Sequence, residues 1–252
     1  MELGLENKLI VVTGAASGIG KAIFMSLLKE GAHPIGLDIK HYKGSYLSEV
    51  WSGDGGEYHQ IDITDNLALE KLFSDVSHLN GLVNNAELMG GDSRYGGRTP
   101  EAWDKVIGNN AKAAYNLIEL LAPKMNKGSS IVNIGSTALD VGEKGTVLYT
   151  VAKGALKAMT LVYAIQLAPN TRVNMVSPGN VSSEQNIKFY EENPKMAEKI
   201  HSKELIGRSA TPEEVANIVA FLLSPVTGAV TGENYVMSSG LGKSLFETVE
   251  TE

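Results

Sequence analysis

Short apolar runs separated by helix-length segments organise this chain. Seven such runs are strand candidates, at 9–12, 35–37, 58–61, 81–83, 130–134, 173–176 and 234–237. Continuous apolar runs are typical of strands buried on both faces, as in parallel sheets. We expect helices over 19–30, 66–76, 100–125, 149–167, 185–206 and 212–223. The alternation predicts an α/β fold with a doubly wound, mainly parallel sheet of about seven strands flanked by helices.

Nothing in the pattern divides the chain, which has no linker rich in Pro, Gly or Ser, no repeat and no low-complexity run. We therefore expect residues 1–252 to form a single domain. The glycine-containing stretches 41–56 and 88–97 are expected to be irregular. Residues 182–207 form an amphipathic insertion after Pro178-Gly179, which predicts a mobile lid over the ligand-binding edge of the sheet.

A glycine-rich turn follows the first predicted strand and opens the first predicted helix. It reads Thr13-Gly-Ala-Ala-Ser-Gly-Ile-Gly20. Without side chains at the glycines, backbone N–H groups and the helix N-terminus can approach a pyrophosphate. In this context the turn predicts a dinucleotide site, and the alternative is a tight turn alone. The expected cofactor contacts are Gly14, Ser17, Gly18, Ile19 and Gly20.

Two acidic residues extend the predicted cofactor site. Asp38 ends the second strand, where a carboxylate can accept hydrogen bonds from the adenosine ribose. A carboxylate disfavours a 2'-phosphate, so NAD is expected rather than NADP, although Lys40 is close by. The alternative is that Asp38 caps a helix. Asp62 and Ile63 are candidate adenine contacts, unless Asp62 only initiates the next helix.

Composition narrows the classes of function. A net charge of -7 argues against a nucleic-acid surface, and the absence of cysteine excludes disulfides and thiolate catalysis. The five histidines lack ligand spacing, so no metal is expected in the chemistry. The sequence contains no membrane-spanning apolar run, and the N-terminus lacks the pattern of a signal peptide. The expected location is the cytoplasm.

Tyr149 and Lys153 are the candidate proton-transfer pair. Residues four apart share one face of a helix, so their side chains reach the same space. A tyrosine pKa is about 10, too high for a base at neutral pH, and a nearby cation favours the phenolate. With Ser136 upstream, the pair suggests alcohol or carbonyl redox chemistry. The alternative is a surface pair that arose by chance.

The motifs together resemble those of the short-chain dehydrogenase/reductase family, over residues 9 to about 241. The matching segments, in chain order, are the glycine turn, Asn84-Asn-Ala86, Asn110, Ser136, Tyr149 with Lys153, Pro178-Gly179 and Thr231-Gly232. The resemblance implies a Rossmann-type fold, a small-molecule substrate and a catalytic tetrad of Asn110, Ser136, Tyr149 and Lys153.

The resemblance also assigns roles. Tyr149 would exchange the proton and Ser136 would hold the substrate oxygen. Lys153 would lower the pKa of Tyr149 and bind the nicotinamide ribose, while Asn110 would position a water. Further implied cofactor contacts are Asn84, Tyr149, Lys153, Pro178, Gly179 and Val181. The alternatives are that Ser136 caps the next segment and that Asn110 interrupts a helix.

The chain departs from the family pattern at two places. Glu87 stands where the family usually has glycine, and Met237-Ser-Ser-Gly240 replaces a common C-terminal motif. Glu87 could recognise a polar substrate group, or it could turn to solvent or pair locally. Further candidate substrate contacts are Lys188 and Tyr190, with Phe189 and Met196 in the same segment. Arg94, Arg98, Lys144 and Lys188 could meet an acidic substrate, but such charges are usually solvated.

The leading hypothesis is an oxidoreductase that transfers a hydride between NAD and a secondary alcohol or ketone, with Tyr149 as general acid and base. The alternatives are a non-catalytic NAD-binding regulatory or scaffold protein and an NADP-dependent ketone or imine reductase. Residues 155–168 are apolar around much of the helix, which suggests a subunit interface. This matches the dimers and tetramers common in the family, so a homo-oligomer is expected.

Overall fold

A seven-stranded parallel sheet forms the centre of the molecule. The structure, a computed structural model, describes residues 2–89 and 91–242. The strand order is β3-β2-β1-β4-β5-β6-β7, and every pairing is parallel. The strands are β1 Leu9–Thr13, β2 His33–Asp38, β3 Glu57–Gln60, β4 Leu79–Asn84, β5 Met125–Ile134, β6 Thr171–Pro178 and β7 Asn234–Met237. The predicted doubly wound α/β fold is confirmed, as a single domain.

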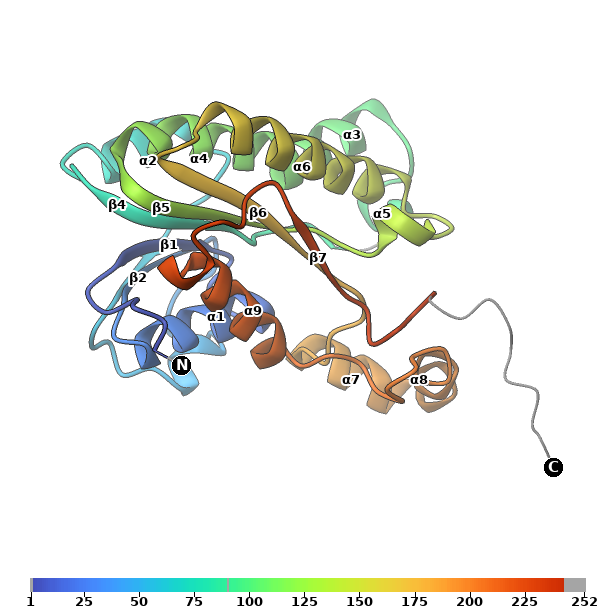
Figure 1. The fold of residues 1–252 in the computed structure, drawn as a ribbon. Coiled ribbons are helices and arrows are strands. Elements are labelled where there is room, and N and C mark those ends of the chain that lie inside the picture. Colours follow the sequence, from blue (N-terminus) through green and yellow to red (C-terminus); the bar gives the residue numbers. More distant parts are fainter. Residues whose placement is uncertain (1, 90, 243–252) are drawn as a thin grey trace.

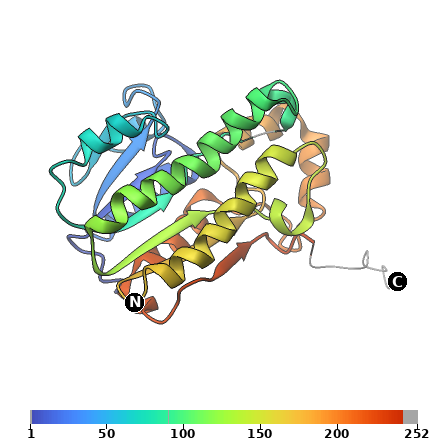
Figure 2. The same cartoon turned by 90° about the horizontal axis from the view of Figure 1, so that it is seen from above.

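Helices cover both faces of the sheet (Figures 1 and 2). One face carries α2 Asn66–Leu72, α4 Ala113–Leu121 and α6 Val147–Gln166, and the other carries α1 Gly18–Lys29 and α9 Pro212–Leu223. The remaining helices are α3 Pro100–Ile107, α5 Ala138–Val141, α7 Glu184–Glu192 and α8 Pro194–His201. A hydrophobic core lies on each face of the sheet: Phe24 of α1 and Val219 of α9 belong to one, and Leu82 of β4 and Leu117 of α4 belong to the other.

Two predicted helices are wrong in outline. The stretch 100–125 is α3 and α4 joined by a π-helical turn, Gly108–Lys112, and the chain enters β5 at Met125. The stretch 185–206 is α7 and α8, because Pro194 starts a new helix and has no N–H to continue the old one. Among the described residues, no helix is long and apolar enough to span a bilayer.

The chain reverses its direction of winding between β1 and β4, which lie side by side although β2 and β3 separate them in sequence. In open α/β sheets, ligands bind outside the carboxyl ends of the strands at such a switch point. Helices α7 and α8 lie near this end of the sheet (Figure 1). The topology therefore places the site here.

Candidate active site

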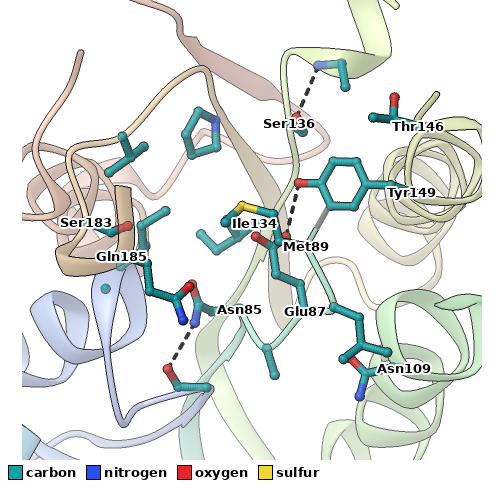
Figure 3. A pocket seen from close by; sticks show the side chains of 18 of the residues that line it. Asn85, Glu87, Met89, Asn109, Ile134, Ser136, Thr146, Tyr149, Ser183 and Gln185 are labelled. Atoms are coloured by element: carbon teal, nitrogen blue, oxygen red, sulfur yellow. Dashed lines mark hydrogen bonds between the residues drawn. The ribbon is translucent and has the colours of Figure 1, made fainter. Parts of the chain in front are cut away.

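A cleft of about 1580 Å³ opens at the carboxyl edge of the sheet. Its lining combines the glycine turn after β1, Asp38 after β2, residues 85–89 after β4, Ser136 after β5 and Pro178-Gly179 after β6. Tyr149 of α6 and residues of α7 and α8 complete the walls. Figure 3 shows the part of the cleft around Tyr149. The predicted cofactor turn and the predicted catalytic tyrosine thus share one cavity.

The glycine turn can accept only glycine at two points. A Cβ at Gly20 would lie 2.0 Å from the Gly14 carbonyl oxygen, and one at Gly14 would lie 2.8 Å from Asn85 Nδ2. Gly14 and Gly18 also have positive φ angles of 70° and 55°. The side chain of Ser17 does not cap α1, so it leaves the N–H groups of the first turn available to a ligand. This cradle fits the pyrophosphate of a dinucleotide.

Thr13 and Asn85 join the glycine turn to the end of β4. Thr13 Oγ1 accepts hydrogen bonds from the N–H groups of Asn85 and Ala86, each at 2.9 Å. Asn85 Nδ2 donates to the Thr13 carbonyl oxygen at 2.9 Å. Asn85 was not among the predicted cofactor residues, although it stands in the quoted motif. Its neighbour Asn84 is a predicted cofactor contact but does not line the cleft, because its Nδ2 donates a hydrogen bond to Asn133 Oδ1 in the sheet.

Asp38 lies in the cleft wall and supports the glycine turn. Its carboxylate accepts hydrogen bonds from Ala16 N at 3.0 Å and from Lys40 N at 2.9 Å. No helix begins after Asp38 before the short turn at Leu47–Glu49, so the alternative of a helix cap is wrong. Asp62 and Ile63 also line the cleft. Asp62 Oδ1 accepts from Thr64 N, whereas the N-cap of α2 is Asp65.

A carboxylate from the predicted lid rests on the glycine turn. Glu184 Oε2 accepts the Gly18 N–H at 2.9 Å, and Glu184 Oε1 lies 2.5 Å from Lys21 Nζ. Burial opposes ionisation of Glu184, but Lys21 and the backbone N–H groups hold its pKa below the usual range. An anionic group therefore already occupies a donor of the turn. Sequence reasoning missed Glu184, although it directly follows Ser182-Ser183 in the candidate lid.

Ser136 and Tyr149 line the other end of the cleft, and Lys153 lies beside Tyr149 but outside the cleft lining. Lys153 Nζ donates to the Ile134 carbonyl oxygen at 2.7 Å, and only 1% of its surface is exposed. The same Nζ lies 5.5 Å from the centre of the Tyr149 ring. Ser136 lies beside the Tyr149 hydroxyl (Figure 3), and its Oγ also accepts from Ala138 N at 3.1 Å. The pairing predicted from four-residue spacing therefore exists, with α6 providing both side chains.

Glu87 enters this group instead of turning to solvent. Its Oε2 lies 2.6 Å from Lys153 Nζ and accepts a hydrogen bond from the Tyr149 hydroxyl at 3.2 Å. Figure 3 shows its side chain extending into the pocket below that hydroxyl. The ion pair offsets the charge of Lys153 next to the phenol.

The pKa of Tyr149 is raised well above its ordinary value. Burial of the phenol is the main cause, the negative charge of Glu87 adds to it, and the neighbouring Ser136 hydroxyl acts in the opposite direction. We had expected Lys153 to bring this pKa down. That prediction is wrong for the arrangement seen here, because Glu87 pairs with the ammonium.

Asn110 holds the backbone beside Glu87. It lies in the π-helical turn, where its Oδ1 accepts from Leu88 N at 2.7 Å and its Nδ2 donates to Leu88 O at 3.0 Å. Its side chain thus contacts the peptide groups of Leu88, and Asn110 does not line the cleft. Its neighbour Asn109 lines the cleft and has a buried Oδ1 with no partner among the described residues, an acceptor that a ligand could satisfy.

The remaining predicted contacts divide between cleft and surface. Pro178, Gly179, Val181 and Tyr190 line the cleft, as do Phe189, Met196 and Arg94. Lys188, the other predicted substrate contact, is exposed on α7 and lies outside the cleft lining. Arg98 is also solvent-exposed and lies 3.9 Å from Asp92. Lys144 does not line the cleft.

Comparison with known proteins identifies the family. The family described as enoyl-(acyl carrier protein) reductase matches residues 14–242. The chain belongs to the short-chain dehydrogenase/reductase family. A relative in this family, the 3-oxoacyl-[acyl-carrier-protein] reductase of Thermotoga maritima, is 34% identical, covering 94% of this chain and 98% of that protein. The D-xylose 1-dehydrogenase of Caulobacter vibrioides is 31% identical, covering 94% and 96%.

A solved structure agrees with the fold and the family. The ligand-free aldohexose dehydrogenase of Thermoplasma acidophilum superposes with a TM-score of 0.86, at 25% identity and with full coverage of both chains. As a member of the short-chain dehydrogenase/reductase family, the chain is an NAD(P)-dependent oxidoreductase that acts on alcohol or carbonyl groups. The glycine cradle and the buried acceptor of Asn109 are consistent with such a cofactor.

Proposed function

We propose that the protein transfers a hydride between NAD and a secondary alcohol or ketone, with Tyr149 as the general acid and base. The observation that carries this proposal is that Ser136 and Tyr149 line the same cleft as the glycine turn, with the buried Lys153 ammonium 5.5 Å from the centre of the Tyr149 ring. The nicotinamide would supply the hydride or accept it. Tyr149 would move the proton at the substrate oxygen, and Ser136 Oγ would hold that oxygen by a hydrogen bond.

The state of Tyr149 favours proton donation at neutral pH. Because its pKa is raised, the phenol keeps its proton and can give it to a ketone oxygen as charge develops there. Oxidation of an alcohol needs the opposite transfer, so it becomes easier as the pH rises toward that pKa. In this proposal Lys153 would hold the nicotinamide ribose, which requires its buried ammonium, now paired with Glu87, to become accessible from the cleft.

The cofactor preference follows from Asp38. Its carboxylate lies in the cleft wall and would face the adenosine ribose, where it can accept hydrogen bonds from the hydroxyl groups. A 2'-phosphate would add negative charge beside it. We infer NAD as the cofactor, held by Gly14, Ser17, Gly18, Ile19 and Gly20 at the turn, by Asp62 and Ile63 at the adenine, and by Pro178, Gly179 and Val181.

The test removes the phenolic oxygen. A Tyr149→Phe protein should lose about 10²- to 10⁴-fold in kcat on ketones and secondary alcohols, while its Kd for NADH stays near the wild-type value. Tyr235→Phe, in β7 and outside the cleft lining, is the matched control. Wild-type activity in Tyr149→Phe would exclude the mechanism. Tighter binding of NADPH than NADH would exclude only the cofactor assignment.

One observation favours a second function. In the Lys153–Glu87 ion pair, the carboxylate offsets the ammonium charge that would otherwise favour the phenolate of Tyr149. A regulatory or scaffold protein that binds the cofactor without turnover could tolerate this pairing. Such a protein would bind NADH with no turnover on a broad panel of alcohols and ketones. Any cofactor-dependent turnover that disappears in Tyr149→Phe would rule this alternative out.

A further inference from the structure

The carboxylate of Glu87 uses one oxygen for the catalytic pair and leaves the other to the cleft. Oε2 contacts both Lys153 Nζ and the Tyr149 hydroxyl, at 2.6 and 3.2 Å. Within residues 2–89 and 91–242, no hydrogen bond or ion pair engages Oε1. Glu87 is part of the cleft lining, and its side chain is 23% exposed. A substrate in the cleft can therefore meet a carboxylate oxygen whose position is already fixed.

The charge of the site determines which group can meet Oε1. Lys153 is buried and its charge is matched by Glu87, so the pair presents little net positive charge to an anionic substrate. An ionised carboxylate can only accept hydrogen bonds. A substrate group beside Glu87 must therefore be a donor. An apolar group there would remove water from the carboxylate without replacing the hydrogen bonds that the water made.

The arrangement around Tyr149 indicates where that donor would lie. In Figure 3, Ser136 and Glu87 lie on opposite sides of the Tyr149 hydroxyl. A substrate oxygen held by Tyr149 and Ser136 leaves the side of Glu87 open to the group on the neighbouring carbon. The two oxygens of a vicinal diol are separated by about the length of a hydrogen bond, as are the Tyr149 oxygen and Glu87 Oε2.

We propose that Glu87 is a specificity residue that selects substrates with a hydroxyl on the carbon next to the one that reacts, namely vicinal diols and α-hydroxy ketones. That hydroxyl donates to the Glu87 carboxylate while Tyr149 and Ser136 bind the reacting oxygen. This inference rests on the proposed alcohol and ketone chemistry. It names the class of substrate, which neither the glycine turn nor the catalytic pair determines.

The test compares substrates that differ by one hydroxyl. Acetoin against butanone, with NADH, and propylene glycol against isopropanol, with NAD, are the two pairs. In the wild type, kcat/KM should favour the hydroxylated member by about 10- to 100-fold, the range expected for one hydrogen bond to a charged group. In Glu87→Ala the preference should fall to within about threefold. Glu143→Ala removes another cleft carboxylate, and should keep the wild-type preference.

Two results would overturn the proposal. One is a wild type with no preference within either pair, and the other is a Glu87→Ala protein that keeps the preference. The cofactor also carries ribose diols, so the Kd of NADH is measured for each variant. A loss of NADH affinity in Glu87→Ala with an unchanged substrate preference would assign Glu87 to the cofactor and exclude the proposal.

Calorimetry separates this inference from the proposed function. Acetoin and butanone are titrated into the protein saturated with ADP-ribose, which lacks the nicotinamide ring, so that neither the ketone nor the hydroxyl of acetoin can exchange a hydride. Tighter binding of acetoin that is lost in Glu87→Ala supports the role of Glu87 even if no alcohol or ketone is turned over. Equal binding of the two ligands contradicts that role even if Tyr149 proves to be catalytic.

Discussion

At the scale of single residues, the acid–base properties of Tyr149 depend on Glu87 more than on Lys153. The phenol is buried, and the carboxylate that accepts its hydrogen bond adds a negative charge, so both effects raise its pKa. Lys153 forms an ion pair with Glu87 and donates a hydrogen bond to the Ile134 carbonyl oxygen. The family pattern usually has glycine at position 87, so Glu87 adds to the effect of burial a charge that the family pattern lacks, and both oppose the lowering that Lys153 predicts.

Removing the charge at position 87 should move the pH dependence of oxidation. In Glu87→Gln the phenolate is no longer disfavoured by a neighbouring anion, so the pKa of Tyr149 falls. The rising limb of kcat/KM against pH for alcohol oxidation should therefore shift to lower pH. Glu143→Gln also removes a charge that raises this pKa, but one with a smaller effect, and should shift the limb less. A shift to higher pH in Glu87→Gln would contradict the assignment.

At the scale of elements, α7 contacts the glycine turn through Glu184. Glu184 stands at its N-terminus and contacts Gly18 and Lys21, in the part of α1 where a pyrophosphate would bind. Two anions cannot share these donors without repulsion, so a dinucleotide must displace Glu184 or bind beside it at a cost. The contact joins residues 166 positions apart and closes α7 over the turn.

Neutralising this carboxylate should strengthen cofactor binding. Glu184→Gln should lower the Kd of NADH several-fold, because the repulsion disappears and Lys21 becomes free to approach the phosphates. Fluorescence titration of NADH measures the change. Glu192→Gln, at the other end of α7, is the matched control and should leave the Kd unchanged. An unchanged or higher Kd in Glu184→Gln would show that Glu184 does not compete with the cofactor.

At the scale of the whole molecule, α6 also presents apolar side chains to solvent. Its inner face carries Tyr149, Lys153 and Leu156, while Leu161, Val162 and Ile165 are exposed, with Ile165 at 81%. An apolar surface of this kind is typical of a subunit contact. We propose that this face joins copies of the chain into a dimer or tetramer.

A charge on that face should separate the subunits. Ile165→Glu should yield a smaller particle by light scattering, because an unpaired carboxylate would be buried in the contact. Circular dichroism would establish that the variant is folded. Leu67→Glu, an equally exposed apolar position on α2, is the control and should not change the particle. The same mass for wild type and Ile165→Glu would place the contact elsewhere.

Sequence and structure agree where the signal is local. Apolar runs located all seven strands, and the four-residue spacing of Tyr149 and Lys153 placed both side chains on α6. The missed features depend on distant parts of the chain. The partners of Glu87 lie on α6, and the Glu184 contact spans lid and turn, so neither leaves a periodic pattern. The π-helical turn at Asn110 is held by Leu88, which sequence alone does not reveal.

The two hydrogen bonds between the Asn110 side chain and the Leu88 backbone limit how the site can change. Both polar atoms of the amide are bonded to Leu88, one to its N–H and one to its carbonyl, so the backbone next to position 87 stays fixed whatever side chain position 87 carries. A substitution at position 87 can then alter what the cleft accepts without disturbing the backbone that supports it. The side chain at position 87 can therefore be exchanged on a backbone that Asn110 holds in place. This makes position 87 a natural starting point for redirecting the enzyme to new substrates.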